Sequence, residues 1–89
     1  MIKTVIVDDE EDSIDSLRLL LSEYCKDITV VGTANSISSG VQQIDSLNPD
    51  LVFLDVEMPF GTGFELLEKI QKVNFQIIFI TASSQYAIS

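Results

Sequence analysis

The sequence lacks histidine and has a single cysteine, Cys25, among its 89 residues. Histidine and cysteine supply the ligands of most zinc and redox-metal sites, so we expect no such site here. A lone cysteine also excludes a disulfide within the chain. We interpret Cys25 as a small buried hydrophobic residue near a helix end.

Basic residues are scarce: 5 Lys and Arg face 14 Asp and Glu, which gives a formal net charge of −9. Because the few basic residues form no cluster, this segment repels a nucleic-acid backbone, and we expect it not to bind nucleic acid directly. Much of the negative charge is concentrated near the N-terminus, too densely for an evenly solvated surface. The residues concerned are Asp8, Asp9, Glu10, Glu11, Asp12 and Asp15.

Long hydrophobic runs are missing as well. The longest, residues 51–54 and 77–80, are far shorter than the roughly 20 residues of a membrane-spanning helix. Asp8 and Asp9 interrupt the N-terminal apolar stretch before the core of a signal peptide could form. We therefore expect one globular domain over residues 1–89, located in the cytoplasm and not in a membrane.

Apolar residues alternate between strand-like runs and helical spacing along the chain. We predict strands at residues 2–7, 28–31 (ended by Gly32), 51–54 and 77–80. The first helix begins near Asp12, with Ile14, Leu17, Leu20, Leu21 and Tyr24 on its apolar face. The second is capped by Asn35 or Ser36, carries Ile37, Val41, Ile44 and Leu47, and stops at Asn48-Pro49. After a loop marked by Gly61 and Gly63, the third carries Phe64, Leu67 and Ile70.

This order predicts a doubly wound α/β fold, a parallel sheet with helices on both faces. The carboxyl ends of parallel strands meet at one rim of the sheet, where ligands of such folds bind. Asp8 and Asp9 follow the first strand, Asp55 the third and Thr81 the fourth. We therefore expect these side chains to lie together.

Three neighbouring carboxylates repel one another unless a proton or a cation neutralises them. With only oxygen ligands available, Mg²⁺ is the cation that fits. A carboxylate beside Mg²⁺ can attack a phosphoryl group to give an acyl phosphate, and Asp55, at the end of the central strand, is placed for this role. The Thr81 hydroxyl can then donate a hydrogen bond to a phosphoryl oxygen. Glu57 lies two residues after Asp55, and Ser83 lies two residues after Thr81. We expect both side chains to flank the water that hydrolyses the acyl phosphate.

Each of these residues alone is more simply a helix cap or an ordinary residue at a strand end. Their joint arrangement carries the inference. Three segments also resemble the receiver domains of bacterial response regulators: VIVDDEE at residues 5–11, PDLVFLDVEMPFGTGFELLEKI at 49–70 and IIFITA at 77–82.

The resemblance implies a flavodoxin-like, three-layer α/β/α fold with strand order 2-1-3-4-5. It implies that Asp9 and Asp55 bind Mg²⁺ directly, that Asp8 helps through water, and that the Glu57 backbone carbonyl is a further ligand. Thr81 would be the switch hydroxyl, and a histidine kinase would donate the phosphoryl group. Receivers are signalling domains, with only self-phosphorylation and self-dephosphorylation chemistry.

Receivers continue into a fifth strand, which ends in a Lys that contacts the phosphoryl group, and a fifth helix. Four of the five units have counterparts in these residues. Residues 82–88 are similar to LytTR-type regulators, in which the receiver precedes a DNA-binding output domain. If the polypeptide ends at Ser89, we expect it to self-associate through its fourth strand.

Two other functions match parts of the sequence. An aspartyl phosphatase of the haloacid dehalogenase type would use an Asp-x-Asp motif, which Asp55-Val56-Glu57 loosely matches. That family, however, places its nucleophile after the first strand. A pseudo-receiver, a binding module that never accepts phosphate, is disfavoured by the site residues after the first, third and fourth strands, but it stays open because the Lys that contacts the phosphoryl group in receivers has no counterpart in residues 1–89.

Overall fold

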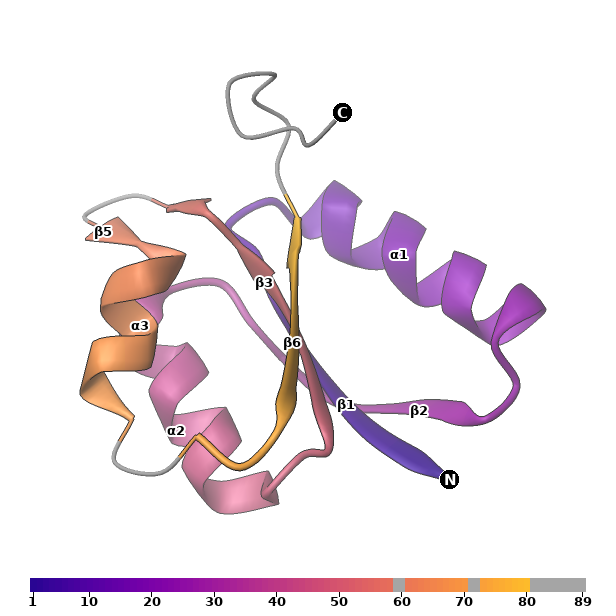
Figure 1. The fold of residues 1–89 in the computed structure, drawn as a ribbon. Helices are drawn as coiled ribbons and strands as arrows, with labels where there is room; N and C mark the ends of the chain where they lie inside the picture. The colour runs from indigo at the N-terminus through magenta and orange to yellow at the C-terminus, as the bar shows by residue number, and fades with distance from the viewer. Residues whose placement is uncertain (59–60, 71–72, 81–89) are drawn as a thin grey trace, which may run out of the picture.

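A parallel four-stranded sheet forms the centre of the fold (Figure 1). The computed structural model describes residues 1–58, 61–70 and 73–80. The strands are β1 (Ile2–Val7), β2 (Ile28–Ala34), β3 (Leu51–Asp55) and β6 (Gln76–Ile80), in the order β2-β1-β3-β6. Every neighbouring pair is parallel. This is the α/β order that the sequence predicted for its first four strands.

Helices cover both faces of this sheet, which gives three layers. Figure 1 shows α1 (Glu11–Tyr24) on one side, and α2 (Ile37–Leu47) with α3 (Gly63–Lys69) on the other. None of the helices in the described ranges is long and apolar enough to cross a membrane.

Each face of the sheet carries its own hydrophobic core. The two central strands, β1 and β3, contribute to both cores because successive side chains of a strand point to opposite faces. In β1, Val5 and Val7 pack toward α2 and α3, whereas Ile6 packs toward α1. In β3, Val52 and Leu54 face α2 and α3, whereas Leu51 and Phe53 face α1. Burial on both sides explains why these strands are nearly continuous apolar runs in the sequence.

The ends of α2 follow from local chemistry, as predicted. The Ser36 side chain accepts a hydrogen bond from the backbone N–H of Ser39 and so caps the helix. Asn48 ends it in the left-handed conformation, with φ of 48°, a backbone region that asparagine tolerates better than most residues. The chain then turns directly into β3.

Several sequence predictions were wrong in detail. Strand β2 continues past Gly32 to Ala34, because a register shift lets Gly32 pair with Val5 of β1. On α1, Leu20 is 54% and Tyr24 76% exposed. Successive helical residues lie about 100° apart, so Leu20 cannot share the buried direction of Leu21, and Tyr24 is the last residue of the helix.

The segment before α3 also differs from the predicted loop. Here β4 (Glu57–Met58) and β5 (Gly61–Thr62) pair as a short antiparallel hairpin, and Gly63 is the first residue of α3. Leu66 of α3 is fully buried in the core and the predicted Leu67 packs partly buried against it, whereas Phe64 is 49% exposed. The Phe64 ring lies against Phe79 of β6, with ring centroids 5.1 Å apart.

Candidate functional site

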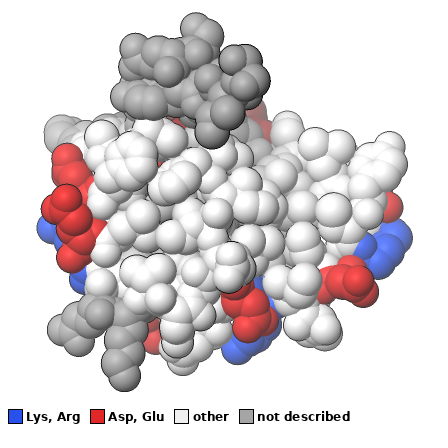
Figure 2. Space-filling view, viewed as in Figure 1, with Lys and Arg blue, Asp and Glu red and all other residues white. Residues whose placement is uncertain are grey.

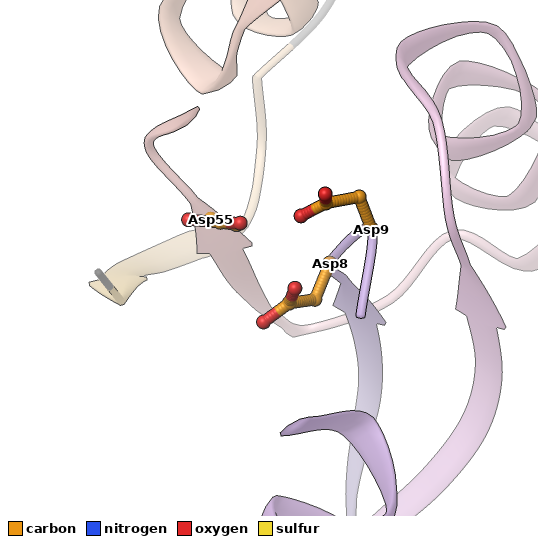
Figure 3. A group of neighbouring side chains, drawn as sticks. All are labelled: Asp8, Asp9 and Asp55. Carbon is orange, nitrogen blue, oxygen red and sulfur yellow. The ribbon is translucent and has the colours of Figure 1, made fainter. Parts of the chain in front are cut away.

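The site lies at the rim where β1 and β3 end. These strands pair in register, with Val7 opposite Leu54, so the residues that follow them emerge side by side. Asp8 and Asp9 come directly after β1, and Asp55 is the last residue of β3. Figure 3 shows the carboxyl groups of Asp8 and Asp9 pointing toward Asp55. The predicted convergence of these three side chains is confirmed.

The three carboxyl groups are close enough to share one ion. One carboxylate oxygen from each lies within 4.8 Å of the others. Asp8 is 6% and Asp55 9% exposed, and Asp9 lies nearer the surface. Two like charges about 5 Å apart repel by about 3 kcal/mol at an effective dielectric constant of about 20. A cation at this position would remove that repulsion for each pair.

The pKa of Asp8 reflects this environment. Burial raises the pKa of Asp8 above its ordinary value of 3.8, and the negative charge of Asp9 raises it further. The backbone N–H of Glu10 donates a 2.9 Å hydrogen bond to Asp8 Oδ1, which lowers the pKa, as does hydrogen bonding to Asp55. The net direction is upward, so a negative charge on Asp8 is disfavoured until something compensates it.

The donor set fits a hard divalent cation. All three candidate ligands are carboxylates, and carboxylate oxygens are the ligands that Mg²⁺ and Ca²⁺ prefer. No histidine is present in the sequence to attract a softer metal, and the single thiol, Cys25, caps the far end of α1. A phosphate-bearing ligand would also need a cation here, because three carboxylates alone repel an anion.

Comparison with known proteins identifies this arrangement. Residues 4–89 match the family described as "Response regulator receiver domain". The chain belongs to this family. Receiver domains of response regulators act in two-component phosphorelay signalling, and this receiver is a signalling domain of that kind.

Individual proteins agree with the family match. The receiver is 42% identical over 89 residues to an uncharacterized response regulatory protein of Vibrio vulnificus, covering 99% of this chain and 36% of that protein. It is 34% identical over 90 residues to the sensory transduction protein LytT of Bacillus cereus, covering 99% and 36%. The response regulator domain of Thermotoga maritima CheB superposes with a TM-score of 0.82 at 28% identity, covering 92% of this chain and 61% of that chain. The receiver sequence therefore spans little more than a third of these two curated relatives.

The remaining predicted site residues are placed only in part. Glu57 lies in β4, where its backbone pairs with Thr62, and its side chain is outside the described residues. Thr81 and Ser83 also lie outside them. The residue before Thr81, Ile80, pairs with Asp55, so β6 ends at the same rim as β3.

Sequence reasoning missed how the start of α3 meets the site. The backbone N–H of Gly63 donates a 2.8 Å hydrogen bond to the carbonyl of Val56. This bond links the first residue of α3 to the residue that follows Asp55. The available signal was the spacing of Thr62 and Glu65, which matches a capping box and marks a helix start. The Thr62 side chain accepts from the Glu65 backbone N–H, as that motif requires.

Proposed function

We propose that residues 1–89 are the N-terminal part of a receiver domain that accepts a phosphoryl group from a histidine kinase onto Asp55. The supporting observation is the clustering of three carboxylates within 4.8 Å at the carboxyl end of the central strands. Phosphorylation would switch an output domain encoded outside these residues. The whole assembly would work in the cytoplasm.

We propose Mg²⁺ as the cofactor, because the donor set consists of oxygens alone. Asp9 and Asp55 would bind it directly, and Asp8 would act through water. The backbone carbonyl of Glu57 would be a further ligand. When bound, the ion offsets the negative charge of the transferring phosphoryl oxygens.

The residues of the chain perform the transfer. A carboxylate oxygen of Asp55 forms a bond to phosphorus while the bond from phosphorus to the imidazole nitrogen of the kinase phosphohistidine breaks. The electron pair of that bond stays on the nitrogen, and Asp55 becomes an acyl phosphate. The hydroxyl of Thr81 would then donate to a phosphoryl oxygen. The side chains of Glu57 and Ser83 would flank the water that later hydrolyses the acyl phosphate and thus modulate its lifetime.

The output is proposed to be a DNA-binding domain of the LytTR type. The likeness to LytT of Bacillus cereus and the similarity of residues 82–88 to such regulators support this choice. The receiver segment itself, with a net charge of −9, is suited to meeting a protein partner and not a nucleic acid.

Incubation of the full natural polypeptide with acetyl phosphate and Mg²⁺, followed by intact mass measurement, tests the proposal. We expect a labile phosphoryl adduct, hydrolysed in alkali as an acyl phosphate is, that is lost in Asp55→Asn. The matched control is Asp45→Asn, which removes an exposed carboxylate of α2 and should keep the adduct. Release of free phosphate without an adduct would favour a phosphatase, and no reaction at all would favour a binding module that does not accept phosphate.

A further inference from the structure

Gly63 lies against the backbone of Asp55 with no space for a side chain. A methyl group built on Gly63 would lie 2.5 Å from the backbone oxygen of Asp55 and 3.0 Å from Cγ of Leu54. Gly63 does not have a positive φ, so the conformational freedom of glycine is not the reason for its presence. The requirement is for space, at a position where the neighbouring atom is backbone and cannot rotate away.

The surrounding hydrogen bonds leave little room for relief. Gly63 donates to the carbonyl of Val56 at 2.8 Å, and the N–H of Val56 donates to the carbonyl of Ile80 at 3.1 Å. The peptide segment after Asp55 is thus held between α3 and β6. The Thr62 cap and the short hairpin before it fix the start of α3 in turn. A larger residue at position 63 must therefore displace either α3 or Asp55.

Displacement of Asp55 would change the acidic cluster itself. Asp8 is anchored independently, because its backbone N–H donates to the carbonyl of Ala34 at 3.0 Å, on the side of β1 away from β3. Asp8 and Asp9 would stay with β1 while Asp55 moved with the end of β3. The spacing of the three carboxylates would then no longer suit one ion.

We propose that Gly63 is a positioning residue: its missing side chain holds the Asp55 backbone at the spacing from Asp8 and Asp9 that cation binding and phosphoryl acceptance need. This inference rests on the proposed function. It assigns to the first residue of α3 a role in the site that its sequence context, read as a loop, did not indicate.

Gly40 provides a matched control within the same molecule. It is also a buried helical glycine, and a methyl group there would meet Cδ1 of Leu66 at 2.6 Å and Cγ1 of Val7 at 3.2 Å. Both contacts are side-chain methyl groups of the core, the Leu66 methyl free to rotate and the Val7 methyl less so, and neither is a backbone atom of the site. Gly40→Ala therefore perturbs packing without acting on the Asp55 peptide.

The test compares Gly63→Ala and Gly40→Ala in the full natural polypeptide. Mg²⁺ is titrated while the amide NMR shifts of Asp9 and Val56 are followed, and phosphorylation by acetyl phosphate is timed. We expect Gly63→Ala to weaken Mg²⁺ binding roughly tenfold, as loss of a supporting contact typically does. Acyl phosphate formation should slow by about ten- to a hundredfold, as for a reacting group displaced by about 1 Å. Gly40→Ala should retain the wild-type Mg²⁺ affinity in its folded fraction, even where its unfolding midpoint is lower.

Each outcome decides the matter. A folded Gly63→Ala with wild-type Mg²⁺ affinity and phosphorylation rate would overturn the positioning role, as would equal losses in both variants. If Gly63→Ala shows no folded population even in a stabilising osmolyte, the residue acts on the fold and not on the site, and the inference is wrong. Failure of the wild-type protein to bind Mg²⁺ or accept phosphate would instead contradict the proposed function.

Discussion

The backbone N–H of Glu10 donates a 2.9 Å hydrogen bond to Oδ1 of Asp8, and this bond is not enough to offset the burial of the Asp8 carboxyl group. The pKa of Asp8 is therefore raised above 3.8. Between that value and the raised pKa, the folded state binds more protons than the unfolded state. The free energy of unfolding consequently falls as pH rises through this window, and the cost is fully present above the raised pKa.

Asp8→Asn should therefore stabilise the protein at neutral pH in the absence of divalent cations. Asparagine keeps an oxygen that can accept the Glu10 hydrogen bond, but it carries no charge. Urea unfolding near neutral pH, with a chelator present, should give a higher midpoint than the wild type. The gain should shrink as the pH falls toward 3.8, where Asp8 is itself protonated. An unchanged or lower midpoint near neutral pH would contradict the assigned cost of the buried charge.

Asp9→Ala should abolish the binding of Mg²⁺. Mg²⁺ is expected to bind weakly without phosphate, because it keeps several waters instead of occupying a full protein cage, and loss of one direct ligand leaves too few. NMR titration of the rim amides is the measurement. Glu23→Ala, near the far end of α1, removes an exposed carboxylate and serves as the control. Identical titrations of wild type and Asp9→Ala would show that this ligand assignment is wrong.

Leu66→Ala should destabilise the fold far more than Phe64→Ala. Leu66 is fully buried, and truncation of a buried leucine typically costs about 2–5 kcal/mol. Phe64 is half-exposed, and its tilted contact with Phe79 is worth about 0.5–1.5 kcal/mol beyond the area it buries. Chemical unfolding of the two variants measures the difference. The helical spacing in the sequence placed Phe64, and not Leu66, on the apolar face. Equal losses of unfolding free energy in the two variants would therefore count against the placement of α3.

The sequence predicted the parallel α/β sheet and the three clustered carboxylates because both follow from general rules, whereas the strand order was implied by the resemblance to receiver domains. Near-continuous apolar runs indicate strands buried on both faces, and parallel strands must present their carboxyl ends at one rim. To predict that Asp8, Asp9 and Asp55 lie together, it was enough to know where two neighbouring strands end. Neither rule depends on how individual side chains pack.

The missed features depend on tertiary packing. Leu66 and Phe64 both fit a helical apolar face, and only the position of α3 against β1 and β3 decides which is buried. Gly63 looked like a loop residue because glycine in a sequence indicates a turn as readily as a close approach. Its contact with the Asp55 carbonyl exists only once the β4–β5 hairpin has returned the chain to the rim.

Asp50→Ala should lower stability without changing Mg²⁺ affinity. The Asp50 side chain accepts a 2.9 Å hydrogen bond from the Lys3 backbone N–H, at the end of the sheet opposite the site. Loss of such an acceptor costs about 0.5–1.5 kcal/mol. Asp50→Asn retains an oxygen acceptor and should lose less. Urea unfolding and Mg²⁺ titration of both variants check the two expectations, and a changed Mg²⁺ affinity would reveal coupling along β1 or β3 that the hydrogen bonds do not suggest.

Strand β6 remains the expected site of self-association for a polypeptide that ends at Ser89. It is an edge of the sheet among the described strands, and its sequence QIIFI contains no charged residue. Ile78 is 46% and Phe79 42% exposed, and Figure 2 shows an area over β6 without charged side chains, which lie nearer the margins of the view. Uncharged edges of this kind pair with other strands.

Light scattering at increasing concentration tests this expectation on a polypeptide of residues 1–89. We expect the mass to rise above that of a monomer, and Ile78→Lys to suppress the increase, because a lysine on an edge strand opposes strand pairing. Leu19→Lys is the control: it changes the net charge equally at another exposed apolar residue, on α1, away from the edge. If both variants suppress association alike, the reduced hydrophobic surface or altered charge is responsible and not β6. A thermally stable wild-type monomer at high concentration would show that the edge is protected.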